Sequence, residues 1–194
     1  MNDPTPSQRH ARKRNRNALL LIAVMIFGSF LIAGALRFSG WRPAGMKNKG
    51  ELLQPPGDLR QLHPQLLEGG EYEWNPIERH WRILVAPPRE CGSRCDQLAS
   101  DLDKVWQLSG READRVKIFW LGPVPASAPL MSHQRGLRDA PALRAALPGA
   151  EASTATTGPV TYIIDPNGFA ILRYAPGHDP GDLRSDLSKL LKLK

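Results

Sequence analysis

The stretch WRILVAPPRECGSRC, residues Trp81–Cys95, joins an apolar run to the two cysteines of the chain. The segment WRILVAP at its start has the composition of a short buried strand. Cys91 and Cys95 follow, with three residues between them. Beyond them, apolar residues recur at helical spacing: Leu98, Leu102, Val105 and Trp106. The stretch therefore predicts a strand that leads into a helix, which begins near the cysteines and ends at about Gly110.

The segments that follow continue the alternation of strands and helices. VKIFWLG, residues 116–122, predicts a strand, and LRDAPALRAAL, residues Leu137–Leu147, predicts a helix. TGPVTYIIDPNGFAILRY, residues 157–174, predicts a β-hairpin around its DPNG turn. Residues 179–194 predict an amphipathic helix capped by Asp179. The predicted order is strand, helix, strand, helix, β-hairpin and helix.

The N-terminal part of the chain predicts a membrane anchor. ALLLIAVMIFGSFLIAGAL, residues Ala18–Leu36, holds nineteen residues without a charge, which is enough to cross a hydrocarbon core of about 30 Å as a helix. Basic residues outnumber acidic ones in the preceding tail, residues 1–17. Because such tails stay in the cytoplasm, we expect a single-pass protein of the inner (cytoplasmic) membrane with its C-terminal domain in the periplasm.

A cleaved signal peptide is the alternative to this anchor, because Ala33-Gly34-Ala35 resembles a cleavage site. The apolar run, however, continues up to these residues without a polar stretch, and secretory apolar regions are usually shorter. We therefore favour an uncleaved anchor and leave cleavage after Ala35 open. In either case, the remainder of the chain acts outside the cytoplasm.

The net charge of +7 gives no indication of a nucleic-acid partner. Five basic residues and one acidic residue lie in residues 1–36, so the tail accounts for most of the excess. Residues 37–79 are rich in proline, glycine and charge, and we interpret them as a tether and domain lead-in. Residues 80–194 are expected to form one domain, since they are numerous enough for a proper core.

Three features of this domain resemble thioredoxin-like proteins. A buried strand leads into a cysteine pair at the start of a helix, a Gly-Pro introduces a strand that ends in Asp-Pro-Asn-Gly, and an amphipathic helix follows the hairpin. The CxxxC spacing together with the anchor resembles the Sco/SenC family of cytochrome c oxidase assembly proteins. This resemblance covers residues 81–194. It implies a thioredoxin-like α/β fold with one N-terminal transmembrane helix, and a role with copper or thiols in CuA-site maturation.

The residues of the cysteine pair allow a metal clamp, a redox couple or a structural staple. Two thiolates suit Cu(I), and the same sulfurs can form a disulfide in an oxidising compartment. Arg89 and Arg94 flank the pair and favour the reactive thiolate. A bridge that closes so small a loop removes little chain entropy, which counts against a staple. We expect Cys91 to attack or bind first and Cys95 to resolve or complete the pair.

The sequence departs from the Sco/SenC pattern in its metal ligands. The family supplies a histidine at a position that falls near Thr157, and no histidine lies between Glu151 and Gly168. Asp96 also replaces the proline that usually follows the second cysteine. His133 and His178 are the nearest substitutes for a third ligand. Copper is therefore a possible cofactor, with Cys91 and Cys95 as its ligands.

Pro159 matches the place of the proline that precedes the strand facing the cysteine pair in thioredoxins. In that family the proline is cis and contacts the partner chain. A cis bond here would hold the backbone of Gly158 open to an incoming peptide, whereas a trans bond would make Pro159 an ordinary turn residue. The sequence leaves these two alternatives open.

Three function classes remain at this stage. The favoured one is a membrane-tethered assembly factor whose partner is a respiratory oxidase subunit, acting by thiol reduction or copper delivery. The second is a general thiol–disulfide oxidoreductase that acts on other extracytoplasmic thiol proteins; the CxxxC spacing departs from the CxxC pattern usual for such enzymes. The third is a binding module that keeps the fold without redox chemistry.

Overall fold

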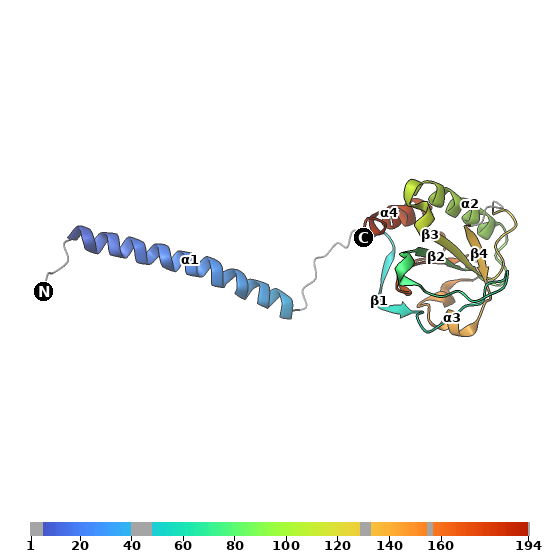
Figure 1. The fold of residues 1–194 in the computed structure, drawn as a ribbon, viewed down its shortest axis with the longest axis horizontal. Helices are drawn as coiled ribbons and strands as arrows, with labels where there is room; N and C mark the ends of the chain where they lie inside the picture. Colours follow the sequence, from blue (N-terminus) through green and yellow to red (C-terminus); the bar gives the residue numbers. More distant parts are fainter. Residues whose placement is uncertain (1–5, 40–47, 129–132, 155–156, 194) are drawn as a thin grey trace. The chain divides into compact units, whose positions relative to one another are not determined.

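The computed structural model of the chain describes residues 6–39, 48–128, 133–154 and 157–193. The chain divides into two compact units, residues 1–46 and 47–194 (Figure 1). The first contains helix α1 (Pro6–Phe38). Its segment Asn15–Phe38 is the one helix among the described residues that is long and apolar enough to cross a membrane. The helix thus includes the predicted apolar run and extends into the basic tail.

The second unit is built on a six-stranded mixed sheet in the order β1-β6-β5-β2-β3-β4. Strand β2 is central, because it pairs in parallel with β3 and antiparallel with β5. Strand β4 adds to β3 in parallel, and β1 adds to β6 antiparallel. The strands are β1 (Glu51–Asp58), β2 (Trp81–Ala86), β3 (Val116–Leu121), β4 (Gln134–Leu137), β5 (Val160–Ile164) and β6 (Phe169–Tyr174).

Helices cover both faces of this sheet (Figure 1). Helices α2 (Ser93–Gln107) and α4 (Pro180–Leu190) pack on one face, where Ile83 and Val85 of β2 join their core. The short helix α3 (Pro141–Ala145) packs on the other face with Leu84. Alternate residues of β2 therefore serve two separate cores. The described part of the unit also contains the 3₁₀ helices η1 (Pro76–Glu78), η2 (Gly110–Arg115) and η3 (Ala150–Ala152).

The predicted strand, helix, β-hairpin and final helix are confirmed, but the predicted helix Leu137–Leu147 is wrong in extent. Leu137 ends strand β4 and pairs with Leu121, so it belongs to the sheet. The helix is only Pro141–Ala145. Pro141 suits its first turn because the N–H that proline lacks has no partner there. The segment that follows β3 is described up to residue 128.

The expected tether and lead-in holds more structure than its composition indicates. The compact unit begins at Lys47, so residues 47–79 belong to it, and strand β1 lies within them at the edge of the sheet. A bulge interrupts the pairing of β1 with β6 between Leu52 and Gly57, where the sequence has two consecutive prolines. An edge strand accepts proline because one side of its backbone needs no partner in the sheet.

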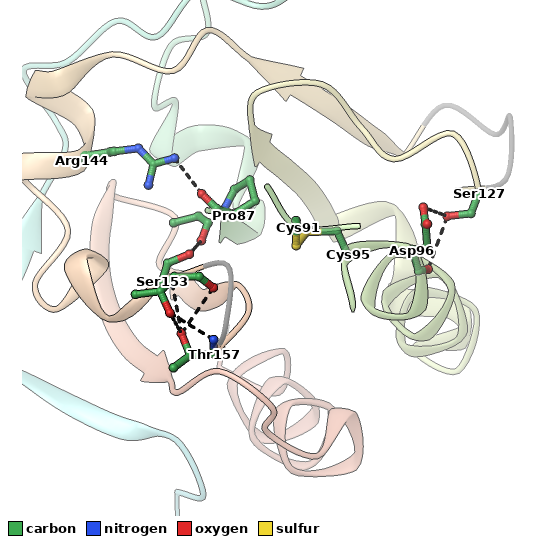
Figure 2. The surroundings of a disulfide bond; sticks show 10 residues. Pro87, Cys91, Cys95, Asp96, Ser127, Arg144, Ser153 and Thr157 are labelled. Carbon is green, nitrogen blue, oxygen red and sulfur yellow. Dashed lines mark hydrogen bonds between the residues drawn. A yellow bond between two sulfur atoms is a disulfide. The ribbon is translucent and has the colours of Figure 1, made fainter. Parts of the chain in front are cut away.

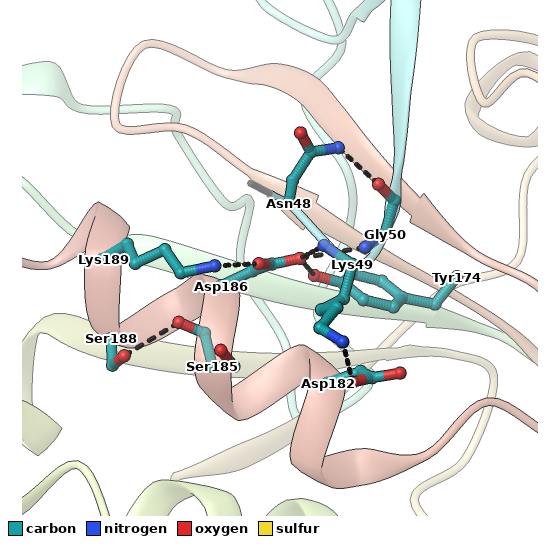
Figure 3. A network of polar contacts seen from close by, with 9 residues as sticks. All are labelled: Asn48, Lys49, Gly50, Tyr174, Asp182, Ser185, Asp186, Ser188 and Lys189. Atoms are coloured by element: carbon teal, nitrogen blue, oxygen red, sulfur yellow. Dashed lines mark hydrogen bonds and ion pairs between the residues drawn. The ribbon is translucent and has the colours of Figure 1, made fainter. Parts of the chain in front are cut away.

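A buried carboxylate fastens the start of this unit to α4 (Figure 3). Asp186 Oδ2 accepts hydrogen bonds from the N–H groups of Lys49 (2.6 Å) and Gly50 (2.9 Å) and from the Tyr174 hydroxyl (2.9 Å). Its Oδ1 lies 3.0 Å from Lys189 Nζ. Burial by itself would raise the pKa of Asp186, but the hydrogen bonds from Gly50, Lys189, Lys49 and Tyr174 outweigh it and lower the pKa.

A buried guanidinium fastens the amino end of β2. Arg82 has no exposed surface, and its Nη1 donates to the carbonyls of Asp165 (3.1 Å) and Pro166 (3.0 Å) in the hairpin turn. Its Nε donates to the Tyr72 hydroxyl at 2.7 Å. Among the described residues no carboxylate forms an ion pair with it. Neutral oxygens and the rings of Tyr72 and Trp74 therefore surround this charge.

Candidate functional site

The two cysteines form a disulfide at the carboxyl end of β2 (Figure 2). Their Cα atoms lie 5.5 Å apart. Cys91 belongs to the loop before α2 and is partly exposed, whereas Cys95 lies in the first turn of α2 and is only 6% exposed. Cys91 is therefore more accessible to a reagent from solution than Cys95.

Gly92 gives the loop between the cysteines its shape. Its φ of +51° lies in the region that residues other than glycine rarely adopt. In this conformation the Gly92 carbonyl accepts hydrogen bonds from the N–H groups of Cys95 (3.1 Å) and Asp96 (3.3 Å). The glycine thus starts α2 directly at the disulfide.

Two side chains hold the strand end that precedes the cysteines (Figure 2). Ser153 Oγ donates to the Ala86 carbonyl at 2.8 Å, and Arg144 Nη2 donates to the Pro87 carbonyl at 2.9 Å. Asp139 orients the guanidinium, with its two oxygens 2.7 and 2.8 Å from Arg144 Nε and Nη2. These bonds fix the backbone before the disulfide without involving either sulfur.

Asp96, which stands where the Sco/SenC pattern has proline, connects α2 to the loop after β3. Its Oδ1 accepts a hydrogen bond from Ser127 Oγ at 2.7 Å. The loop is thereby attached to the helix one residue after Cys95 (Figure 2). The departure from the family pattern thus has a structural role in this chain.

Two cavities border the start of α2, and the cysteines line the first of them. The first, which we call the Trp120 cavity, measures about 400 Å³ and is lined by both cysteines, Arg89, Trp120 and Arg144, among others. The second, which we call the Arg94 cavity, measures about 430 Å³ and lies between the starts of α2 and α4. Its lining includes Arg94, Gln97, Asp101, Thr157, Pro159 and His178.

Pro159 lies in the wall of the Arg94 cavity, and its peptide bond is trans. Gln54–Pro55 is the only cis bond among the described residues, so the cis alternative for Pro159 is not realised. Gly158 before it has a φ of +102°, and a Cβ built on it would lie 3.3 Å from Arg94 Cδ. The Arg94 side chain therefore lies against the backbone that the cis alternative would have left open.

Thr157 stands where the family resemblance places a histidine. Its hydroxyl donates to the Ala152 carbonyl at 2.8 Å and lies 2.7 Å from Thr154 Oγ1. The N–H groups of Thr154 and Thr157 each donate to the other's hydroxyl at 3.0 Å. These contacts close the loop before β5 on itself.

His133 lies just before β4, away from the cysteines. Its Nε2 is 2.7 Å from Asp103 Oδ1, and its ring stacks on Trp106 with the centroids 4.1 Å apart. Asp103 follows Cys95 by eight residues of α2, which corresponds to about 12 Å along a helix. The structure thus places His133 with Asp103 and Trp106.

His178 lies just before α4, in the wall of the Arg94 cavity. Its Nδ1 is 3.2 Å from the Ala175 carbonyl, and its ring packs against Tyr174. Burial lowers the pKa of His178 below its usual value, because desolvation disfavours the charged ring. The ring is therefore neutral at physiological pH.

A three-ligand copper site does not fit these residues as they are arranged. Within the described residues, no three His, Cys, Asp or Glu side chains gather closely enough to hold a metal ion. The sulfurs of Cys91 and Cys95 are bonded to each other. Neither His133 nor His178 forms a ligand group with them. After reduction the pair would offer two soft ligands.

Several contacts at the site could not be found from the sequence. Arg144 lay inside the predicted helix, and nothing in its surroundings indicated that it would reach the Pro87 carbonyl. The sequence shows Arg94 only as a basic residue close to the cysteines. Its contact with Gly158 depends on the approach of two distant segments. Asp96 did give a signal, because it departs from the family pattern.

Both the sequence and the fold of this unit are similar to those of known proteins. Residues 81–194 match the family model described as transmembrane-like, thioredoxin-like, C-terminal domain. No curated protein matches the chain. Similar solved structures are Trgpx in apo form (TM-score 0.49, 16% identity, covering 70% of this chain and 95% of that one) and BsSco, a member of the Sco family of cytochrome c oxidase assembly proteins (0.49, 12%, 75% and 98%).

Another similar structure is Arabidopsis thaliana ScoI with copper bound, at a TM-score of 0.45 and 16% identity, covering 75% of this chain and 99% of that one. At these values, neither chemistry nor partners transfer from those proteins. The family model, by contrast, spans more than half of the chain, from the start of β2 through α4. The chain therefore belongs to the transmembrane-like, thioredoxin-like C-terminal domain family and has a thioredoxin-like fold.

Proposed function

We propose that the chain is a membrane-anchored thiol–disulfide exchange protein that acts outside the cytoplasm through Cys91 and Cys95. One observation supports this most directly: the pair forms a disulfide in which Cys91 is partly exposed and Cys95 is buried. Such asymmetry suits a couple in which one sulfur meets the partner and the other resolves the mixed disulfide. The basic tail before the apolar run supports the proposed orientation.

In the oxidising direction, a partner thiolate attacks Cys91 Sγ. The Cys91–Cys95 bond breaks, and Cys95 leaves as a thiolate that takes up a proton. A second partner thiolate then attacks the partner sulfur of the mixed disulfide and releases the Cys91 thiolate. Two electrons have moved from the partner dithiol to the chain, which now carries two thiols. In the reducing direction the Cys91 thiolate attacks a partner disulfide and Cys95 resolves it; the relative potentials set the direction.

We further propose that the partner is a respiratory oxidase subunit whose copper-site cysteines must be thiols before they bind metal. The CxxxC spacing and the candidate membrane helix support this choice. Metal-binding cysteines act as thiolates, and an extracytoplasmic compartment tends to oxidise them. In this role the reduced chain reduces a disulfide in the oxidase subunit. General exchange with other extracytoplasmic thiol proteins is the alternative.

Trapping of the mixed disulfide tests the exchange. The full chain in mild detergent is mixed with a peptide that carries the two copper-site cysteines of an oxidase subunit, in its disulfide form. We expect the reduced wild type to reduce it. Cys95→Ser should accumulate a mixed disulfide through Cys91, and Cys91→Ser should form none. Ser188→Ala, on the exposed side of α4, is the control and should behave as wild type.

Two further arms separate the alternatives. Equal rates with the oxidase peptide and with an unrelated disulfide peptide would favour general exchange. Copper delivery is tested by competition between the reduced chain and a tight Cu(I) chelator without oxygen. Tight one-to-one binding that is lost in the Cys91→Ser/Cys95→Ser variant would support delivery by two thiolates. If no variant exchanges thiols with any peptide, the proposed function is wrong.

A further inference from the structure

The Arg144 guanidinium is held in place through its Nε and Nη2 atoms. These atoms lie 2.7 and 2.8 Å from the two carboxylate oxygens of Asp139. Nη2 also donates to the Pro87 carbonyl at 2.9 Å (Figure 2). Among the described residues, none accepts a hydrogen bond from Nη1. Arg144 therefore presents a fixed guanidinium whose Nη1 can still donate to an oxygen of a partner.

Arg89 brings a second guanidinium to the same place. The residue is exposed, and among the described residues none forms a hydrogen bond or an ion pair with its guanidinium. It precedes Cys91 by two residues. It also lines the Trp120 cavity, together with both cysteines and Arg144. The charge of Arg89 is therefore available to a partner that reacts at Cys91.

A third cavity, which we call the Ser153 cavity, adjoins the Trp120 cavity at these two arginines. It measures about 550 Å³, and its lining includes Pro88, Arg89, Asp139, Pro141, Arg144 and Ser153. Four of these residues also line the Trp120 cavity: Pro88, Arg89, Asp139 and Arg144. The two cavities thus share a wall that carries both guanidiniums, and the cysteines line the first of them.

The charges of the Ser153 cavity favour an anion. Among its described lining residues, Asp139 is the one carboxylate, and both of its oxygens already accept hydrogen bonds from Arg144. The positive charge of Arg89 is left over. The Trp120 cavity contains a second carboxylate, Asp96, whose Oδ1 accepts a hydrogen bond from Ser127 Oγ. The preference for an anion therefore belongs to the Ser153 cavity and not to the space next to the sulfurs.

A partner chain bonded to Cys91 is able to reach the Ser153 cavity. An extended chain advances by about 3.3 Å per residue, so residues two or three positions from the partner's cysteine lie roughly 7–10 Å from it. In this chain, Arg89 and Pro88 precede Cys91 by two and three residues. The partner residues that meet the two guanidiniums are therefore close to its cysteine in sequence without adjoining it.

We infer that the Ser153 cavity receives an acidic side chain that lies two or three residues from the reacting cysteine of the partner, and that Arg89 and Arg144 bind its carboxylate. A guanidinium pairs with a carboxylate through parallel hydrogen bonds, which suits this task better than a point charge. The inference rests on the proposed thiol–disulfide exchange and specifies its substrate class: polypeptides with Asp or Glu near the reacting cysteine.

Arg94 provides a matched control. It also flanks the cysteine pair, but it is not among the described lining residues of the Trp120 and Ser153 cavities. Arg94→Gln removes a positive charge near the sulfurs and keeps the first part of the side chain, which lies against Gly158. A general effect of charge on thiolate reactivity would appear in Arg94→Gln and Arg89→Gln alike. Recognition of an acidic side chain would be lost only in Arg89→Gln.

The test uses oxidised full chain in mild detergent and reduced peptides. Each peptide has one internal cysteine and, after a glycine-rich linker, a second cysteine that resolves the mixed disulfide. The peptides differ only in Glu, Gln or Lys placed one, two or three residues from the internal cysteine, on either side in turn. The measured quantity is the rate at which each peptide reduces the Cys91–Cys95 bond.

For wild type and Arg94→Gln, we expect Glu at two or three residues to give a rate about two- to five-fold above that of Gln, as for a partly exposed ion pair. Added salt should weaken this preference, since it screens exposed charges. Arg89→Gln should remove the preference, and Arg89→Glu should favour the Lys peptide.

Dithiothreitol, a small uncharged dithiol, is the reference reductant for every variant, so changes in the intrinsic reactivity of Cys91 can be divided out. Equal rates for Glu and Gln at every position with wild type, or a Glu preference that persists in Arg89→Gln, would overturn the inference and leave thiol exchange intact. Equal loss of the preference in Arg94→Gln would overturn it as well. If dithiothreitol reduces the bond but no peptide reacts, the proposed function itself fails.

Discussion

The two ends of strand β2 differ in how their polar groups are held. At the amino end, the Arg82 guanidinium is fully buried, and described neighbours accept its hydrogen bonds. At the carboxyl end, the disulfide lines a cavity of about 400 Å³, and one of its two cysteines, Cys91, is partly exposed. One end is closed by packing, whereas the other leaves room for a partner.

The amino end of β2 therefore contributes to the stability of the fold, whereas its carboxyl end carries the reactive disulfide. The bonds that fix the carboxyl end reach the backbone carbonyls of Ala86 and Pro87 and leave both sulfurs free of them. The disulfide can therefore open without breaking these bonds. The amino end has no such freedom, because removal of its guanidinium would break the hydrogen bonds that join β2 to Tyr72 and to the hairpin turn.

The largest expected effect is at the amino end. Arg82→Met should lower the free energy of unfolding by about 3–5 kcal/mol, because it removes three hydrogen bonds from a charged group, to the Tyr72 hydroxyl and to the carbonyls of Asp165 and Pro166. Urea unfolding of the full chain in mild detergent, followed by tryptophan fluorescence, measures this loss. Arg89→Met is the control and should change little. A loss below about 1 kcal/mol would show that the hydrogen bonds of Arg82 contribute little to the stability of the fold.

A second buried charge, Asp186, should have the next largest effect. Asp186→Asn should cost about 2–3 kcal/mol, since a charged acceptor of several hydrogen bonds becomes a neutral one. Because the folded pKa of Asp186 is lowered from 3.8, its stabilisation is present above that pH and is lost as the pH falls through the folded pKa. Urea unfolding between pH 3 and 7 should therefore show a weaker acid dependence in Asp186→Asn than in wild type. Asp182→Asn, whose carboxylate is 44% exposed, is the control.

Opening of the disulfide should have a smaller effect than either change. The bridge closes a loop of only five residues, so its removal should cost on the order of 2 kcal/mol. Unfolding of the wild type with and without dithiothreitol measures this cost, and Cys91→Ser/Cys95→Ser should show no dependence on the reductant. A loss as large as that of Arg82→Met would make the disulfide a structural staple.

The same contrast explains what the sequence could predict. Trp81–Ala86, α2 and α4 were readable because each carries its own periodicity and its own start and stop signals. The cysteine pair was predicted at the start of a helix for the same reason. Local pattern therefore sufficed for the central strand, for the helices on one face and for the position of the disulfide.

Features that depend on distant segments could not be read in this way. Strand β1 contains consecutive prolines and resembles a tether, and only its pairing with β6 makes it a strand. Strand β4 has four residues and no clear period. The role of Arg82 has no signal in the sequence, since Tyr72 and the hairpin turn meet it only in the folded chain. The Arg94 cavity likewise forms where α2 approaches the start of α4.

The smallest expected effect is the pH dependence of the free energy of unfolding that comes from two histidines, one near each end of β2. Burial lowers the pKa of His178 beside the Arg94 cavity and of His80 just before β2. As the pH falls below 6.5, the unfolded chain binds protons that the folded chain does not, so the free energy of unfolding should decrease. At and above pH 8 this contribution should be absent.

Single substitutions assign the pH dependence to one end or the other. His178→Gln and His80→Gln should each remove part of the slope between pH 5 and 8, measured by urea unfolding of the full chain. Arg82 contributes nothing to the slope, since a guanidinium keeps its charge throughout this range. If both variants kept the full slope of the wild type, neither histidine would be the source of the pH dependence.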